Sequence, residues 1–342
     1  MEFMKEYSYI KRAILRELCE DSRISVTGLA DRLKCSRNTV LSNMKALDRE
    51  FGLLHTIEFD REMIHTNYVQ VWCIQFGKKP STEELKRLFQ GDYRVRLVAE
   101  TEGDFDLIIN VAADIADRYM NWSIRTINGL LPFIPKIMPS NVIMAHTGFF
   151  IVRNELLKKL DLAHLGLDEL DKKILMVLNE NSRMSYREIA NIIDANVETV
   201  RYRLARIMKI GIVRRFTTVL RRSPMSYNMA FFINYEMAPG IRQRYDEAMK
   251  YYTRVDGKLP LINSFQYLAL MSGSHTMFGI GCFESEEAAM RKVVMEHKEI
   301  YKEDNPKVRY AKITKVIKGT LPLRNMDLAK DYRQINWEPD TY

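Results

Sequence analysis

Cysteine is scarce in this sequence and does not occur in a metal-binding spacing. The 342 residues include four cysteines and no Cys-x-x-Cys pair: Cys19, Cys35, Cys73 and Cys282. This pattern argues against a zinc site, and so few cysteines in a chain of this size do not form a disulfide scaffold. We therefore expect free thiols in a reducing compartment and no bound metal.

Long apolar runs are also lacking. No segment approaches the length of about eighteen uncharged apolar residues that a membrane-spanning helix requires. Residues 1–15, MEFMKEYSYIKRAIL, lack the apolar core of a signal peptide. We expect a cytoplasmic protein that does not enter the membrane.

Several catalytic signatures are missing. There is no phosphate-binding glycine loop, no His-Glu-x-x-His and no Gly-x-Ser-x-Gly, and no histidine-rich cluster or paired-carboxylate site emerges. We expect no cofactor. The formal net charge is +8, which favours an anionic partner, nucleic acid before membrane.

The sequence does contain a motif that occurs twice. Residues 14–40 (ILRELCEDSRISVTGLADRLKCSRNTV) and 174–200 (ILMVLNENSRMSYREIANIIDANVETV) align without a gap, which indicates a duplicated structural unit. The identical pairs include Ile14/Ile174, Leu15/Leu175, Leu18/Leu178, Glu20/Glu180, Ser22/Ser182, Arg23/Arg183, Ser25/Ser185, Ala30/Ala190, Thr39/Thr199 and Val40/Val200. In each copy the apolar residues fall at helical spacing in three successive segments, as in a helix-turn-helix. We call residues 1–62 the first reader and residues 167–222 the second reader.

The third helix of the first reader would place its N-terminal residues against base edges in the DNA major groove. Arginine and asparagine make bidentate contacts to guanine and adenine, while serine and threonine suit phosphates or either base. The predicted contact residues are Ser36, Arg37, Asn38, Thr39, Asn43 and Lys45. The alternative is a polar helix face that touches only water, since the charge of this copy is nearly balanced.

The second reader is more basic. Ser185 and Glu188 fit a capping box, and Gly211 is placed to end the third helix in a left-handed conformation. The stretch 201–222 holds eight basic residues and no acidic one: Arg201, Arg203, Arg206, Lys209, Arg214, Arg215, Arg221 and Arg222. Arg214 and Arg215 open a predicted β-wing, and such a stripe suits a phosphate backbone. The predicted DNA contacts are Asn196, Thr199, Arg201, Tyr202, Arg203, Arg206, Arg214 and Arg215.

A β-α-β-β-α-β pattern follows each reader, which predicts a ferredoxin-like four-stranded sheet with two helices on one face. In the first half the last strand is expected near residues 139–152, and in the second half the helices are expected at 241–252 and 285–301. The fold class is α+β. The predicted division is 1–62 (winged helix-turn-helix), 63–152 (sheet domain), 153–166 (linker), 167–222 (winged helix-turn-helix), 223–322 (sheet domain) and 323–342 (tail).

This organisation resembles the Lrp/AsnC family of transcription regulators. The matching segments are LDELDKKILMVLNENSRMSYREIA, VETVRYRLARIMKIGIVRRFTTVL and TEGDFDLIINV, the last with the Gly-x-x-Asp turn of that family. The resemblance implies dimerisation through the sheet domains and a small effector, such as an amino acid, bound at Gly103, Asp106, Gly273 and His275. The sequence departs from the family by carrying the unit twice, and Thr276 or Met277 stands where the second aspartate is expected.

Two other functions are compatible with these features. Siroheme decarboxylases resemble the same family, and His146, His275 and the arginines could serve a tetrapyrrole. An adaptor that binds RNA polymerase would also keep the fold. The acid-free stripe of the second reader favours DNA, so we expect a sequence-specific transcription regulator and not an enzyme. Its expected partners are double-stranded DNA, a second copy in a homodimer, and RNA polymerase or basal factors.

One prediction concerns base reading by the first reader. Arg37→Ala or Asn38→Ala should relax sequence preference at about one or two base pairs, because each removes a side chain that can bond to a base edge. Selection from randomised DNA measures the preference. Unaltered preference would mean that this reader does not read bases.

Overall fold

The computed structural model describes residues 9–60, 63–64, 68–147, 150–220, 227–234, 265–283, 285–291, 307–319 and 321. They form two compact units. The reader unit lies within residues 2–65 and 151–224, and the barrel unit lies within residues 66–150 and 225–325. Both readers thus belong to one unit and both β-rich segments to the other. Among the described residues, no helix has the length and apolar character needed to span a membrane.

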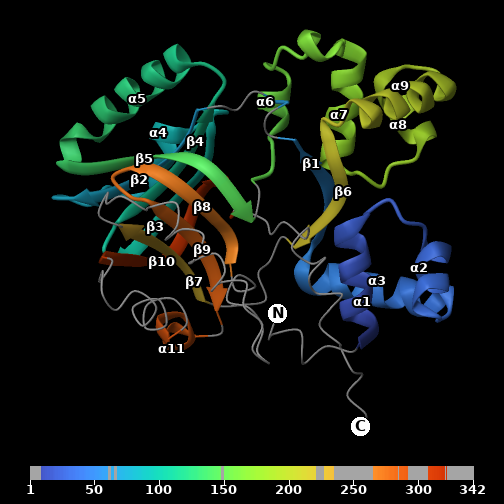
Figure 1. Cartoon of the computed structure of the whole chain (residues 1–342), viewed down its shortest axis with the longest axis horizontal. Helices are drawn as coiled ribbons and strands as arrows, with labels where there is room; N and C mark the ends of the chain where they lie inside the picture. The colour runs from blue at the N-terminus through green and yellow to red at the C-terminus, as the bar shows by residue number, and fades with distance from the viewer. Residues whose placement is uncertain are drawn as a thin grey trace, which may run out of the picture. The chain divides into compact units, whose positions relative to one another are not determined.

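Each reader is a three-helix unit, drawn in Figure 1. The first contains α1 (Tyr9–Glu20), α2 (Val26–Leu33) and α3 (Arg37–Phe51), and the second contains α7 (Glu169–Glu180), α8 (Tyr186–Ile193) and α9 (Val197–Ile210). The predicted capping box of Ser185 and Glu188 is confirmed at the start of α8. Gly211 ends α9 with φ +90°, as predicted. Apolar residues at the repeated positions are buried, Ile14 and Ile174 completely, so the repeat encodes two equivalent cores.

The strand that follows each third helix pairs with its counterpart in the other reader. Strands β1 (Leu53–Phe59) and β6 (Val213–Leu220) form a two-stranded antiparallel sheet between the two sets of helices, with Ile57 opposite Phe216 (Figure 1). The predicted wing is therefore one strand of a sheet that the readers share. The two readers are thus joined directly, through strands of their own.

The identical residues at the Ser-Arg positions of the repeat hold the readers together. Ser22 Oγ and Ser182 Oγ share a buried hydrogen bond of 2.5 Å. Arg23 Nη1 donates to the carbonyls of Ser182 (2.5 Å) and Met184 (3.0 Å). Arg183 Nη1 returns the contact to the carbonyls of Ser22 and Ile24. The interface is thus pseudo-symmetric, which explains why both copies carry the same two residues.

The segment before the second reader is structured. It contains α6 (Asn154–Leu157) and the short helix η3 (Ala163–Leu165). Asn179 Nδ2 on α7 donates to the Val152 carbonyl (2.7 Å) and to Asn154 Oδ1 (3.0 Å). Residues 153–166, predicted as a linker, therefore pack against the second reader.

The described strands of the barrel unit form a closed antiparallel barrel of eight strands. They are β2 (Tyr68–Phe76), β3 (Val95–Gly103), β4 (Leu107–Ala113), β5 (Pro135–Thr147), β7 (Tyr227–Asn234), β8 (Phe265–Gly273), β9 (Met277–Phe283) and β10 (Lys307–Gly319). Their order is β10-β3-β4-β2-β5-β8-β9-β7. The first four strands run β3-β4-β2-β5 and the last four run β8-β9-β7-β10, so each set keeps the same order. The sets join at β3–β10 and β5–β8. This closure joins the two four-stranded sheets expected from the sequence, and each of the described strands has a hydrogen-bonded neighbour on both sides.

Two apolar cores lie on opposite faces of the first four strands. The outer face packs under α4 (Thr82–Phe89) and α5 (Ala116–Leu130). There the Trp72 and Trp122 rings pack edge to face, with their centroids 4.8 Å apart. The inner face joins the barrel interior, which is filled by side chains such as Phe105 and Phe232.

Strand β5 begins at Pro135, earlier than the predicted residue 139, because the short helix η2 (Leu131–Phe133) ends directly before it. Of the two helices predicted in the second half, residues 241–252 lie outside the described residues. The other is described only as far as residue 291 and contains α11 (Glu286–Ala289).

The reciprocal arginines give a stability prediction. Arg183→Ala removes hydrogen bonds to two carbonyls in the reader interface and should lower the free energy of unfolding by about 2 kcal/mol, as for other bonds to charged groups. Arg23→Ala should act similarly, and the double variant should lose less than the sum because both arginines hold one interface. Denaturant unfolding measures this, with the exposed Arg187→Ala as control. Losses no larger than the control's would mean that the arginines do not hold the readers together.

Candidate nucleic-acid interface and the predicted effector turns

The predicted contacts of the first reader gather at the start of α3, but two of them serve the helix itself. Ser36 Oγ accepts from the Thr39 amide at 3.0 Å and caps the helix. Asn43 Nδ2 donates to the Thr39 carbonyl at 2.8 Å. Arg37, Asn38 and Lys45 are exposed on the helix. These three side chains remain available for bases or phosphates.

The start of α9 shows the same division. Asn196 caps the helix through its Oδ1, which accepts from the Glu198 amide at 2.8 Å, and Thr199 is half-buried. Tyr202 is 71% exposed. Arg201 is exposed, forms an ion pair of 3.2 Å with Glu198 and lies over the Tyr186 ring. The most accessible predicted contacts on this helix are therefore Arg201 and Tyr202.

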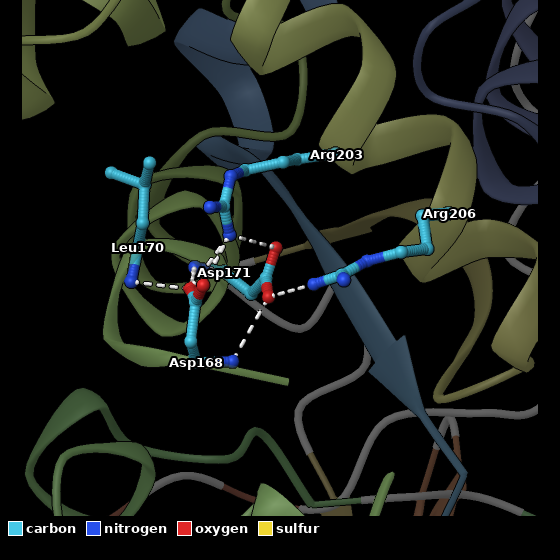
Figure 2. A network of polar contacts seen from close by, with 5 residues as sticks. All are labelled: Asp168, Leu170, Asp171, Arg203 and Arg206. Carbon is cyan, nitrogen blue, oxygen red and sulfur yellow. Dashed lines mark hydrogen bonds and ion pairs between the residues drawn. The ribbon is translucent and has the colours of Figure 1, made fainter. Parts of the chain in front are cut away.

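Two arginines of α9 bind carboxylates at the start of α7. Figure 2 shows Arg203 and Arg206 reaching from one helix to Asp168 and Asp171 on the other. Arg203 Nη1 is 2.7 Å from both carboxylate oxygens of Asp168 and 3.2 Å from Asp171 Oδ1. Arg206 Nη2 donates to Asp171 Oδ2. We call these four residues the α7–α9 clamp.

The acids of this clamp also cap α7. Asp168 Oδ1 accepts from the amides of Leu170 and Asp171, and Asp171 Oδ2 accepts from the Asp168 amide. The side chain of Asp171 is completely buried. Hydrogen bonding from Arg203 lowers the pKa of Asp168 to about 2, so this carboxylate stays ionised at any physiological pH.

The predicted wing arginines also have a carboxylate partner. Arg215 Nε lies 2.6 Å from Glu58 Oε2, and Arg214 Nη1 lies 3.7 Å from Glu58 Oε1. Glu58 is buried and belongs to β1, the strand of the first reader. Arg221 and Arg222 lie outside the described residues.

Sequence reasoning missed Asp168, Asp171 and Glu58. For the clamp a signal was present, since two acids three residues apart precede two arginines three residues apart, and i, i+3 residues share a helix face. Glu58 carries no such signal, because Arg215, its nearer partner in space, is 157 residues away in the sequence.

The predicted effector residues lie on two equivalent turns of the barrel unit. Gly103 and Gly273 have φ of +130° and +117°. A Cβ at these positions would lie 2.7 Å from the Tyr310 carbonyl oxygen and 2.9 Å from that of Pro139. Glycine is therefore required by the backbone at both turns.

Asp106 closes a loop of the barrel unit. Its carboxylate accepts from the Phe76 amide (2.9 Å) and forms an ion pair with Lys79 (2.7 Å). The Asp106 carbonyl accepts from Thr101, just as the Thr276 carbonyl accepts from Met271 in the other turn. Thr276 is thus the counterpart of Asp106. An amino-acid effector at these turns stays a prediction.

His275 lies inside the barrel and is 2% exposed. Ser140 Oγ lies 3.3 Å from its Nδ1 and accepts from its backbone amide. The ring packs against Phe105 and Phe232. Burial, reinforced by the positive charge of Arg309, lowers its pKa to about 4. The imidazole is therefore neutral at physiological pH.

The two histidines of the alternative reading are not equally described. The side chain of His146 lies outside the described residues. Across the described ranges, no group of three or more histidine, cysteine, aspartate or glutamate side chains is arranged to hold a metal ion.

Both readers match known protein families. The AsnC-type helix-turn-helix domain matches residues 167–208, and a winged helix-turn-helix DNA-binding domain matches residues 8–50. An uncharacterised HTH-type transcriptional regulator of Pyrococcus furiosus is 34% identical over 113 residues, which are 33% of this chain and 69% of the relative. The chain belongs to the Lrp/AsnC family. A similar regulator of Pyrococcus horikoshii is 31% identical over 112 residues, 33% of this chain and 65% of its own length.

A solved structure resembles nearly the whole chain. The siroheme decarboxylase NirDL aligns with a TM-score of 0.60 over 95% of this chain and 98% of its own, at 13% identity. At this identity the likeness concerns the fold alone. The fold of nearly the whole of this Lrp/AsnC chain therefore has a precedent among solved proteins.

The buried His275 gives a pH prediction. Its pKa is lowered in the folded state, so the unfolded chain binds the proton more tightly and stability falls as the pH drops from about 6.5 to about 4. The loss for this group is about 3 kcal/mol. His275 and Phe105 occupy equivalent positions of the two turns. The substitution His275→Phe therefore introduces the side chain found in the other turn, and it should remove that part of the pH dependence.

Unfolding by denaturant at pH 7 and pH 4.5 measures this dependence in both proteins. His55, whose pKa burial also lowers to about 4, lies in the reader unit and is unchanged by the substitution. Equal pH dependence in the two proteins would show that His275 titrates normally in the folded barrel.

Proposed function

We propose that this chain is a sequence-specific DNA-binding transcription regulator that carries a paired reader within one polypeptide. The observation that carries this proposal is the reader unit, in which α3 and α9 both expose polar N-terminal residues and are joined through the shared β1–β6 sheet. A third helix that exposes its N-terminal residues is how helix-turn-helix proteins enter the major groove. We propose no catalytic activity.

The contacts that we assign are the accessible ones. On α3 they are Arg37, Asn38 and Lys45, and on α9 they are Arg201 and Tyr202. Arginine and asparagine can distinguish base pairs by paired hydrogen bonds, while lysine suits phosphate. The capping residues Ser36 and Asn196 would contribute through the helix N-termini, where backbone amides favour phosphate.

The two exposed surfaces differ, so the paired reader should prefer a non-palindromic site. The α3 helix begins RNTVLSN and the α9 helix begins VETVRYR. A homodimer of this chain would carry four readers and restore symmetry at a larger scale. We further propose that the barrel unit consists of two duplicated ferredoxin-like halves, since each set of four strands keeps the same order.

An enzymatic function is the second candidate, favoured by the fold shared with a siroheme decarboxylase and by a neutral histidine beside Arg309 inside the barrel. Against it stand the buried ring of His275, its hydrogen bond to Ser140 and the apolar side chains that fill the barrel. DNA binding accounts for the exposed arginine, asparagine and lysine side chains on α3 and for the exposed Arg201 and Tyr202 on α9.

The experiment is selection of bound genomic fragments by the purified chain, followed by salt titration on the best fragment. A recurrent motif bound far more tightly than random DNA is expected, with affinity falling steeply as salt rises. Arg201→Ala should weaken binding and reduce the salt slope by about 0.9, the value of one phosphate contact.

The matched control is Arg125→Ala, which removes the same charge from an exposed position on α5 of the barrel unit. It should leave the slope unchanged. Weak binding without sequence preference would contradict the proposal, and a spectral change on adding siroheme would then favour the enzyme.

A further inference from the structure

We infer that Arg203 and Arg206 do not contact DNA but position the second recognition helix, with Asp168 and Asp171 as their partners. This inference rests on the proposed DNA-binding function. It gives a new role to two arginines of the basic stretch 201–222. From the sequence alone, both were predicted to contact DNA.

Geometry supports this role first. Asp168 and Asp171 are three residues apart at the start of α7, and Arg203 and Arg206 are three residues apart on α9, so two pairs of side chains face each other across one helix–helix contact (Figure 2). Arg203 contacts both carboxylates at 2.7–3.2 Å. The bonds of Arg203 and Arg206 lie about one helical turn apart along α9. Together they therefore restrict both the rotation of α9 about its axis and its sliding along α7.

Charge compensation supports it next. Two guanidinium groups meet two carboxylates, so the clamp has no net charge to offer to a phosphate. A phosphate that drew Arg206 away would leave Asp171, whose side chain is completely buried, as a buried carboxylate with a weakened set of partners. Breaking a buried ion pair on one side is strongly unfavourable. The arginines are therefore held by their own acids.

Two polar atoms of the clamp lack a hydrogen bond, which agrees with a role in positioning α9. Asp171 Oδ1 and Arg206 Nε have no aligned hydrogen-bond partner, although Oδ1 lies 3.2 Å from Arg203 Nη1. A pair kept only for stability would be better replaced by apolar side chains, since a buried ion pair adds little net stability. What the charged pair supplies in addition is one defined orientation.

The first reader shows what the helix looks like without this clamp. At the positions equivalent to Asp171, Arg203 and Arg206 it has Lys11, Asn43 and Ala46. Lys11 forms an ion pair with Glu50 at 3.5 Å, and Asn43 bonds to its own helix. The clamp is thus specific to the second reader and is not required to form the three-helix fold.

The test compares Asp168→Asn with Arg203→Gln in the full chain. A positioning role and a phosphate-contact role for Arg203 predict opposite changes in DNA affinity when Asp168 is replaced. If Arg203 positions α9, both variants break the same clamp. Both should then reduce affinity for the selected site by about tenfold, the effect of one mismatched base pair, with the salt slope unchanged. If Arg203 contacts phosphate, Asp168→Asn releases it and should tighten binding and steepen the slope, while Arg203→Gln should reduce the slope by about 0.9.

A rescue variant separates positioning from loss of fold. Asp171→Asn combined with Arg206→Gln keeps hydrogen-bonding side chains at both positions without charge, and should recover specific binding that Asp171→Asn alone loses. Thermal unfolding followed by circular dichroism identifies any variant that has simply unfolded. Tighter binding by Asp168→Asn, or a reduced slope for Arg203→Gln, overturns the inference while leaving the proposed function intact. A wild-type chain without sequence-specific binding overturns both.

Discussion

The pairing of β1 with β6 is the constraint on which the reader unit depends. It places Leu53 opposite Leu220 and Ile57 opposite Phe216, so two segments that are distant in the sequence become one sheet. Once that ladder forms, the serine and arginine pairs of the two readers face one another, and the backbone amide of Ser22 reaches the Phe216 carbonyl. The distance between the recognition helices is then set by hydrogen bonds and packing and not by the length of a linker. The barrel unit follows the same logic, since its closure also requires each half to pair with the other.

Pseudo-symmetric pairing allows the two copies to diverge where they face each other. In the barrel interior, Phe105 on one turn meets His275 on the other, and Met138 on β5 meets Arg309 on β10. A symmetric dimer of a single-unit protein would have to place identical side chains at such positions. Here one member of each pair is apolar and the other is polar. His275 and Arg309 therefore lie beside Phe105 and Met138, and not beside a second histidine or a second arginine. Two equivalent turns or strands on one chain thus permit combinations that strict symmetry forbids.

Local signals in the sequence predicted the elements well, and long-range pairing was the part they could not supply. The capping box at Ser185 and the left-handed Gly211 follow from residue type and spacing over a few positions. The apolar periodicity of α1 and α7 shows that one face is buried but does not say what covers it. For that reason the sequence could not predict that Glu58 would form ion pairs with Arg214 and Arg215, or that β3 would pair with β10. Of the candidate site, exposure of Arg37 and Tyr202 was predictable, whereas the capture of Arg203 by Asp168 depends on how α7 and α9 cross.

The acid-free stripe of the second reader shows why charge counted along a sequence overstates charge offered to a ligand. Within its described part, Arg203 and Arg206 face Asp168 and Asp171, Arg214 and Arg215 face Glu58, and Arg201 contacts Glu198. Each pair reduces the potential that a phosphate backbone would feel, so affinity for random DNA should be modest for a protein of net charge +8. Modest non-specific affinity is useful to a regulator, because a genome offers a vast excess of competing sites and the ratio of specific to non-specific binding decides occupancy. The internal carboxylates lower the affinity for phosphates, and a well-positioned recognition helix strengthens the contacts with bases. Both therefore raise the ratio of specific to non-specific binding.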